Sequence, residues 1–551
     1  MTAMRYFSLR SREENPFEEV YYRVEKNLVN LPFWHWRHSH ISVAMRKRVF
    51  QALYSLLSRP YFRRLWVLQE IAPGARSTPV MCGTRCVPLD DIYRTLQLIR
   101  GVDGNDLGRQ IVCSTKGHRG MERSWDQLPA GIDTYTISEK LWERPIALIE
   151  AQNVPQTIRK SAVHDDIFGA LILSREANTS DDRDRIYGIL GLPCLAVIVK
   201  IVPDYHLPAI YTYITFAKSL FRRGYFNGLR LVASPVPRID TKYFQPASIS
   251  RPRAPKFARC PEVVNPGCEH GLPSWVVCWS CPRNPAVHLS SHSSAALESY
   301  SVTPAFRDDK LMIIQGVLFD NINRLSAFHA TESDRRYPFN GHEVRSIYGS
   351  DADTLEAFWR TITGNTTRSG APPPPSWSMI LEPVIWNFGS GSVDQNRNKI
   401  FGLHNFFARN KSLRLFGRTL AQLINHEDEI TERSLAQRLR ESTSGQKSAR
   451  YWNRTSSERQ VLRDATLRAM QVLAWRRLIT INEGYMGLAP AATRAGDIVA
   501  IVSGCDVPLV LRPEGNRFRV LGESYVHGMM SGEIVKMLEQ GTKKMIHITL
   551  C

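Results

Sequence analysis

RPYFRRLWVLQEIAPG, residues 59–74, is the stretch that decides how the first part of this chain folds. Pro60 suits the first turn of a helix, where a backbone N–H donor is not needed. Apolar side chains then recur at helical intervals, at Tyr61, Leu65, Leu68 and Ala72. Pro73 and Gly74 end the pattern. The stretch therefore predicts one helix from Tyr61 to Ala72.

Glu70 is the candidate functional residue of this helix. Trp66 lies one helical turn before it, so both side chains would share a face. An aromatic ring beside a carboxyl group lowers the local polarity and raises the pKa of that carboxyl, which suits a general base or a ribose-binding group. The alternative is a surface acid that pairs with Arg63 or Arg64. The residues alone favour the surface acid.

The composition indicates a folded protein without a specific nucleic-acid partner. At 551 residues the chain has room for roughly two to four domains. The formal net charge of +19 would favour an anionic partner, but the basic residues are scattered, and the densest groups are the doublets Arg63-Arg64 and Arg476-Arg477. We interpret them as a solvated, arginine-rich surface.

The sequence also predicts a cytoplasmic location. The first twenty residues have no apolar run typical of an export signal, and no run approaches the ~18 apolar residues of a membrane span. The ten cysteines are expected to be reduced thiols.

Several further segments have clear periodicity. Residues 79–83 and 310–322 predict strands, and residues 90–100, 209–224 and 354–363 predict helices. Helical patterns fill roughly 400–475. The tail, 476–551, consists of short β-rich runs between turn residues, typical of a small antiparallel barrel or meander.

A cysteine cluster in the middle of the chain raises the question of a metal. Its members are Cys260, Cys268, His270, Cys278 and Cys281. The two-residue gap between Cys278 and Cys281 lets both thiolates reach one zinc ion. The upstream spacing is irregular and Cys278 lies in a Trp-rich run, so buried structural cysteines are the default and no metal is assigned. A zinc-binding module remains the alternative.

Several blocks together resemble one family, the fungal heterokaryon-incompatibility (HET) domain proteins. Arg64, Trp66, Gln69 and Glu70 match the Arg-x-Trp-x-x-Gln-Glu pattern of the third HET block. Further blocks follow in the expected order, at 182–192, 203–205, 272–276, 356–361 and in the tail up to about 535. The first two HET blocks have no counterpart before residue 59.

The resemblance implies a fold and a division of the chain. HET domains are similar to TIR domains, so the expected fold is α/β, a TIR-like HET domain truncated at its front. A mostly helical middle region and a small C-terminal antiparallel β module would follow. The expected parts are 1–102 for the partial HET domain, 103–235 for a variable insertion and helical segment, 236–475 for an irregular connection and helical region, and 476–551 for the β module.

The resemblance also implies a function. Proteins of this family act in allorecognition that ends in programmed cell death, through self-association or binding to other incompatibility proteins. Some TIR domains hydrolyse NAD with a glutamate one turn after a tryptophan, which makes an NAD glycohydrolase using Glu70 the alternative. By resemblance, Glu70 would hold the nicotinamide-ribose hydroxyls while the glycosidic bond breaks. NAD would then be a substrate, and no resident cofactor is expected.

Overall fold

A computed structural model describes Leu56 and residues 59–71, 77–93, 160–175, 177–196, 198–232, 270–281, 289, 303–328, 343–367, 370–381, 403–425 and 455–551. The chain divides into two compact units, 1–209 and 210–551. Each unit is described by itself.

In the first unit, the prediction of one continuous helix from Tyr61 to Ala72 is wrong. A 3-10 helix, η1 (Pro60–Arg63), is followed by a separate α-helix, α5 (Val67–Ile71). Between them Arg64 is extended, with φ −75° and ψ 141°. The reason is a tertiary contact: Arg64 forms a parallel bridge with Asn178, whose carbonyl accepts the Leu65 N–H at 3.2 Å. Pro60 does occupy the first turn, as predicted.

A β-hairpin and short helices make up the rest of the described first unit. Strand β1 (Pro79–Cys82) confirms the predicted strand, and β2 (Arg85–Pro88) pairs with it across a turn in which Gly83 has φ 59°. Residues 89–93 are helical, and the rest of the helix predicted for 90–100 lies outside the described residues. Helices α10 (Lys160–Arg175), α11 (Asp184–Tyr187) and α12 (Pro193–Ala196) follow. This hairpin holds the only strands in the described part of the unit, so the TIR-like sheet stays a prediction.

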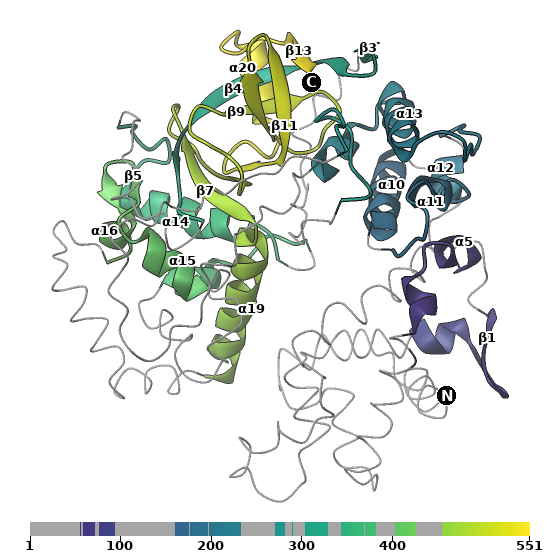
Figure 1. The fold of residues 1–551 in the computed structure, drawn as a ribbon. Coiled ribbons are helices and arrows are strands. Elements are labelled where there is room, and N and C mark those ends of the chain that lie inside the picture. Colours follow the sequence, from purple (N-terminus) through teal and green to yellow (C-terminus); the bar gives the residue numbers. More distant parts are fainter. Residues whose placement is uncertain are drawn as a thin grey trace, which may run out of the picture. The chain divides into compact units, whose positions relative to one another are not determined.

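The second unit is built on a closed β-barrel (Figure 1). Its ring is formed by β4 (Leu311–Leu325), β13 (Ile546–Leu550), β11 (Arg517–Glu523), β10 (Leu509–Glu514) and β9 (Ile498–Val502). Each strand pairs with the next in this order, and β9 pairs back to β4, which closes the ring. Closure removes the free edges that an open sheet would expose.

Strand β4 holds the barrel together because it pairs with several strands along its 15 residues. Register shifts between Leu318 and Asp320, and again before Arg324, mark bulges that let the strand bend. At Gly316 the neighbouring strand is close: an added Cβ would lie 2.7 Å from the Ile501 carbonyl oxygen. Only glycine fits there without moving the backbone.

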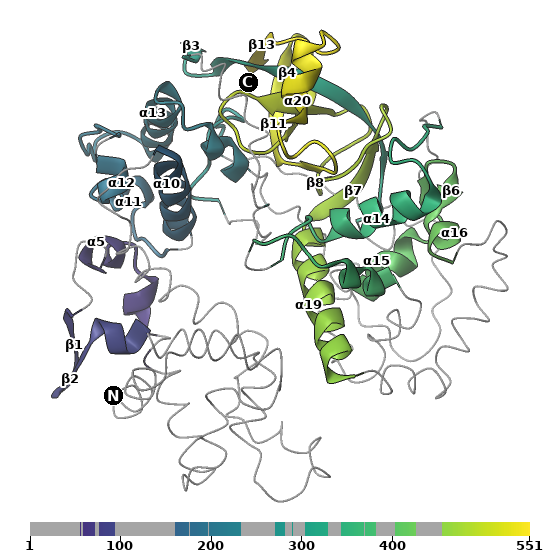
Figure 2. The ribbon, with the colours of Figure 1, turned by 180° about the vertical axis from the view of Figure 1, so that it is seen from behind.

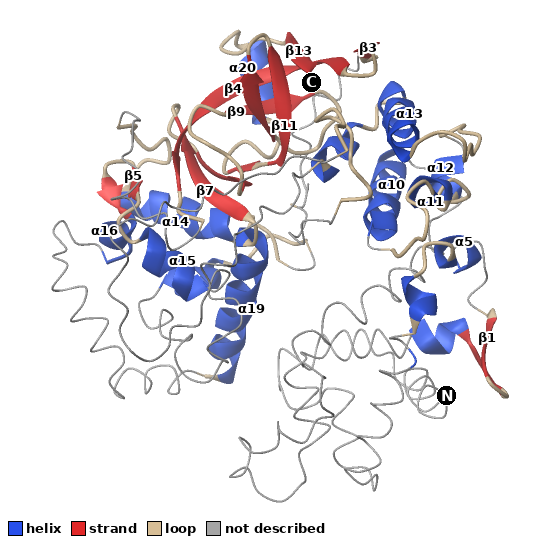
Figure 3. Ribbon diagram, viewed as in Figure 1, coloured by secondary structure: helices blue, strands red, loops and turns tan. Residues whose placement is uncertain are grey.

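The β module is therefore larger than predicted. It recruits β4 and β3 (Ala305–Arg307), which lie far upstream of residue 476, and it is not wholly antiparallel, because β11 and β13 pair in parallel. Strands β7 (Arg476–Ile481), β8 (Met486–Pro490) and β12 (Tyr525–Val526) extend the sheet beyond the ring (Figure 3). The strand predicted at 310–322 is confirmed. The alternation of apolar and polar residues in this strand could not show which other strands would pair with it.

The barrel encloses an apolar core. Side chains from all around it meet there, including Val317, Phe319, Ile501, Val510 and Leu521. Helix α20 (Glu533–Glu539) adds Ile534 to the same cluster. Burial of this apolar surface is the main favourable term for the fold.

Helices cover the strands that extend from the barrel (Figure 2). They are α14 (Asp351–Ile362), η8 (Pro375–Leu381), α15 (Leu403–Asn410), α16 (Leu420–Asn425) and α19 (Ser456–Leu473). Their apolar faces share one core with Leu478, Leu488 and Tyr525 of the sheet. Capping boxes at Ser350 and Thr455 fix where α14 and α19 begin.

Two of the predicted helices are confirmed, α14 and α13 (Ala209–Arg222). The described part of 236–475 also holds β3, β4 and the hairpin of β5 (Arg414–Leu415) and β6 (Arg418–Thr419). A mostly helical middle region is therefore not confirmed.

The Arg476-Arg477 doublet is not a solvated surface group, contrary to the sequence interpretation. Arg476 is 5% exposed and donates to the Glu523 carboxylate at 2.7 Å, and Arg230 of η5 (Phe226–Leu231) donates to its other oxygen at 3.1 Å. The Leu289 N–H also donates to Glu523. Arg477 is buried too, and it donates to the carbonyls of Ala491 and Ser326. Burial lowers the pKa of Arg476, and the Glu523 charge opposes that effect.

We expect Glu523→Gln to destabilise the second unit strongly. It removes the charge that compensates two buried guanidinium groups, and breaking such a buried pair costs roughly 3–5 kcal/mol. Chemical denaturation of the full chain measures the loss in free energy of unfolding.

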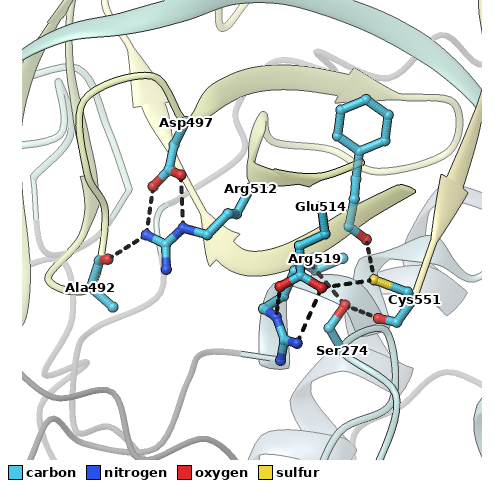
Figure 4. Close-up of polar contacts among 9 residues, drawn as sticks. Ser274, Ala492, Asp497, Arg512, Glu514, Arg519 and Cys551 are labelled. Atoms are coloured by element: carbon cyan, nitrogen blue, oxygen red, sulfur yellow. Dashed lines mark hydrogen bonds and ion pairs between the residues drawn. The ribbon is translucent and has the colours of Figure 1, made fainter. Parts of the chain in front are cut away.

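Glu514→Gln is the matched control, because Glu514 pairs with Arg519 on the surface of the same sheet (Figure 4). That pair should contribute only about 0–1 kcal/mol. Equal losses in both variants would contradict the structural role of Glu523.

Candidate functional site

Helix α5 divides the Arg64–Glu70 block into an inner and an outer face. Val67, Leu68 and Ile71 are buried, while Trp66 is 37% exposed and Glu70 is exposed. The Glu70 N–H donates to the Trp66 carbonyl at 3.2 Å, so the two residues are one turn apart, as predicted. Both point outward from the packed face of the helix.

Glu70 has an aromatic hydroxyl as a hydrogen-bond partner, which the sequence analysis missed. The pKa of Tyr61 is raised, first by its partial burial, then by the negative charge of Glu70 and by the hydrogen bond between the two side chains. The Tyr61 phenol therefore donates to the Glu70 carboxylate. Tyr61 belongs to η1 and Glu70 to α5, the two helices that Arg64 separates.

Gln69 faces inward and packs against the Asp182–Leu192 block. Its Nε2 donates to the Tyr187 carbonyl at 3.3 Å. An added Cβ at Gly191 would lie 3.1 Å from Gln69 Cδ, and one at Gly188 would lie 2.6 Å from Leu65 Cδ2. The two sequence blocks thus form one packed unit, and Gln69 serves to join them.

The Pro203–Tyr205 block is bonded to the same unit. The Tyr187 hydroxyl donates to the Asp204 carbonyl at 3.0 Å and accepts from the Asp204 N–H at 3.1 Å. The Tyr205 hydroxyl donates to the Asp184 carboxylate at 2.7 Å. A tyrosine of each block is therefore hydrogen-bonded to an aspartate of the other block.

Arg183 completes this network. Its guanidinium forms an ion pair with Asp181 at 2.7 Å, donates to the carbonyls of Tyr205 and Leu207, and lies over the Tyr205 ring at 5.2 Å. The hydrogen bond from Arg183 lowers the pKa of the Asp181 carboxyl. The acidic and basic groups of this block are thus bonded to one another, which suits a rigid support.

The described part of the first unit exposes a set of large apolar side chains. They are Tyr61, Trp66, Met81, Val202, Tyr205 and Leu207. Tryptophan and tyrosine are among the residue types that contribute most binding energy in protein interfaces. Arg64, the remaining residue of the predicted block, is also exposed.

One group in the described residues is suited to hold a metal. The ligand atoms of His270, Cys278 and Cys281 all lie within 4.8 Å of one another. The structure therefore brings together three residues of the predicted cysteine cluster. Cys260 and Cys268 lie outside the described residues.

Comparison with known proteins identifies the class of the second unit first. Residues 407–543, which include β9, β10 and β11 of the ring, match the Het-6 beta-barrel domain. The chain is also similar to heterokaryon incompatibility protein 6, OR allele, of Neurospora crassa, with 21% identity over 521 residues. The alignment covers 88% of this chain and 66% of the relative, so the chain spans less than two thirds of that protein. The two matches show that this chain carries a Het-6 beta-barrel domain and is similar to a heterokaryon incompatibility protein.

No solved structure matches the chain. Among the described residues, no helix is both long enough and apolar enough to cross a membrane.

We expect Tyr205→Phe to remove a pH-dependent part of the stability of the first unit. The hydrogen bond to Asp184, followed by burial, raises the pKa of Tyr205 from 10.0 to about 12. The protonated phenol makes the bond, so its contribution is complete below pH 10 and is lost as the pH rises through about 12. The difference in unfolding free energy between wild type and Tyr205→Phe should therefore shrink over this range.

Denaturation at several pH values measures this difference. Tyr211→Phe is a suitable control, because Tyr211 is 52% exposed and Tyr205 is 47% exposed. A difference for Tyr205→Phe that stays constant up to pH 12 would contradict the Tyr205–Asp184 contact.

Proposed function

We propose that this chain acts in heterokaryon incompatibility, the recognition of genetically different fungal cells. The observation that carries the proposal is the similarity to the Neurospora protein, which extends over 88% of the chain and thus over both units. The barrel match in the second unit is an independent support.

Recognition would occur by binding another protein, either a second incompatibility protein or another copy of this chain. The apolar side chains exposed on the first unit support this mechanism, since tryptophan and tyrosine are enriched among the residues that dominate binding energy. We propose that binding takes place in the cytoplasm and starts the signal for programmed cell death.

A second candidate function is the hydrolysis of NAD by Glu70. It is favoured by one observation, the exposed carboxylate of Glu70 one turn after Trp66 with the Tyr61 hydroxyl bonded to it. In such a reaction the bond between ribose and nicotinamide breaks through an oxocarbenium-like state, which a nearby carboxylate stabilises. Nicotinamide leaves with the electron pair of the broken bond, and water then adds to the ribose carbon and loses a proton to solvent.

The incompatibility role predicts that Trp66→Ala weakens the response. The chain is expressed in one of two otherwise compatible fungal strains, and cell death after hyphal fusion is counted with a vital dye. Loss of an anchoring tryptophan costs roughly 2 kcal/mol of binding free energy, about thirtyfold in affinity. We therefore expect far fewer dead fusion cells.

Ile347→Ala is the control for this experiment, because Ile347 is a comparably exposed apolar residue of the second unit. Protein levels of both variants are compared by immunoblot. An unchanged response with Trp66→Ala would exclude Trp66 as a binding residue. No response with wild type would exclude the role in incompatibility.

The binding mechanism predicts that the purified chain does not consume NAD, even without a partner and at high protein concentration. Chromatography of the nucleotide pool over time measures this. If wild type consumes NAD, and Glu70→Gln abolishes this activity while Glu539→Gln preserves it, the hydrolase function replaces the binding mechanism. Glu539 is an exposed glutamate of the second unit and serves as the matched control.

A further inference from the structure

Three metal-ligating atoms converge in the segment that precedes the barrel strands. His270 Nδ1 lies 3.5 Å from Cys278 Sγ and 3.8 Å from Cys281 Sγ. All three residues belong to the second unit, whereas Trp66 and Glu70 belong to the first. The cluster is therefore independent of the proposed function.

The two nitrogen–sulfur distances fit a tetrahedral zinc site, and the two sulfurs lie within 4.8 Å of each other. With a Zn–S bond of about 2.3 Å and a Zn–N bond of about 2.0–2.1 Å, tetrahedral angles place the sulfur and nitrogen about 3.6 Å apart. Both observed distances lie close to this value. One cation could therefore bind all three atoms at once.

The surrounding contacts fix the segment in this conformation. Trp275 is fully buried and donates its Nε1–H to the Lys310 carbonyl at 3.1 Å. The Ser274 N–H donates to the Cys551 carbonyl, and the Ser274 hydroxyl accepts from the Val520 N–H at 2.9 Å (Figure 4). Ser274 is thus bonded to Val520 of β11 and to Cys551, the residue that follows β13. The cysteine pair is held in place by the barrel.

The other end of the segment contacts helix α13. The Ser280 and Tyr213 hydroxyls lie 2.8 Å apart, and Trp279 packs edge-on against Phe216 with ring centroids 6.1 Å apart. The two cysteines therefore flank the point where the segment passes from the barrel to the helix. Cys278 is buried, Cys281 is half-buried and His270 is exposed, which leaves a path from solvent to the cluster.

We propose that His270, Cys278 and Cys281 bind one Zn²⁺ ion. The ligands are the Nδ1 of the neutral imidazole and two thiolates, and a water molecule completes the tetrahedron on the exposed side of His270. The two thiol protons are released to solvent on binding, and the two thiolates neutralise the charge of the ion. The ion would close the loop from His270 to Cys281, while Ser274 and Trp275 hold that loop to the barrel and Trp279 and Ser280 hold it to α13.

Metal analysis of the full chain tests this proposal. The protein is purified under reducing conditions without a metal-affinity tag, and zinc is measured by mass spectrometry. We expect about one zinc ion per chain in wild type, and a loss of most of it in Cys278→Ser and Cys281→Ser. Cys86→Ser, which changes an exposed cysteine of the first unit, should retain the metal.

Two further measurements keep the test independent of folding defects. His270→Ala changes an exposed side chain and should leave the fold intact while lowering the zinc content. In wild type with cobalt in place of zinc, thiolate ligands give a charge-transfer absorption band, which both cysteine variants should weaken. A chelator should lower the thermal midpoint of wild type but not that of Cys278→Ser.

Three outcomes would overturn the proposal. The first is wild-type protein that carries no zinc and gives no cobalt band. The second is a zinc content equal in wild type, His270→Ala and Cys281→Ser, which would mean that the metal binds elsewhere. The third is a disulfide between Cys278 and Cys281 in freshly purified protein, which would assign the pair to redox chemistry.

Discussion

The buried carboxylate of Glu523 is the constraint on which the second unit depends. It lies on β11 of the barrel and accepts hydrogen bonds from Arg230, Arg476 and the Leu289 N–H. These partners come from η5, from the first strand beyond the ring, and from the segment that precedes β3. Because an ion buried without a partner is costly, the three segments must reach this position together for the unit to fold. The carboxylate thereby fixes the arrangement of the barrel and its neighbours as well as contributing to their stability.

The first unit is held together by packing and hydrogen bonds between its sequence blocks. Leu65 and Gln69 lie against the two glycines of the Asp182–Leu192 block, Gly188 and Gly191. Tyr187 and Asp184 of that block are hydrogen-bonded to the Pro203–Tyr205 block. Residues of one motif therefore have different tasks. Gln69 joins the blocks, while Trp66 and Glu70 remain at the surface, where a partner or a substrate can reach them. This division is why the incompatibility proposal relies on Trp66 and the hydrolase alternative relies on Glu70.

The sequence predicted elements well where a local pattern was sufficient. The periodicity of α13 and α14 and the alternation of β4 each identified the right element. It failed where a distant contact decided. The helix from Tyr61 was broken at Arg64 by pairing with Asn178, and the arginines at 476 and 477 were assigned to the surface although a carboxylate and backbone carbonyls receive them in the core. The cysteine pair was visible in the sequence, but its distance to His270 was not.

By itself, the sequence determined the apolar periodicity, the capping residues and the family blocks, because each depends on residues within a few turns of one another or on their order along the chain. The tertiary structure alone decided the closure of the barrel through β4, the burial of Arg230 and Arg476 around Glu523, and the convergence of His270 with the two cysteines. These features join residues that are far apart along the chain or lie across a bend. Their geometry follows from the packing of whole elements, which no local pattern of residues encodes.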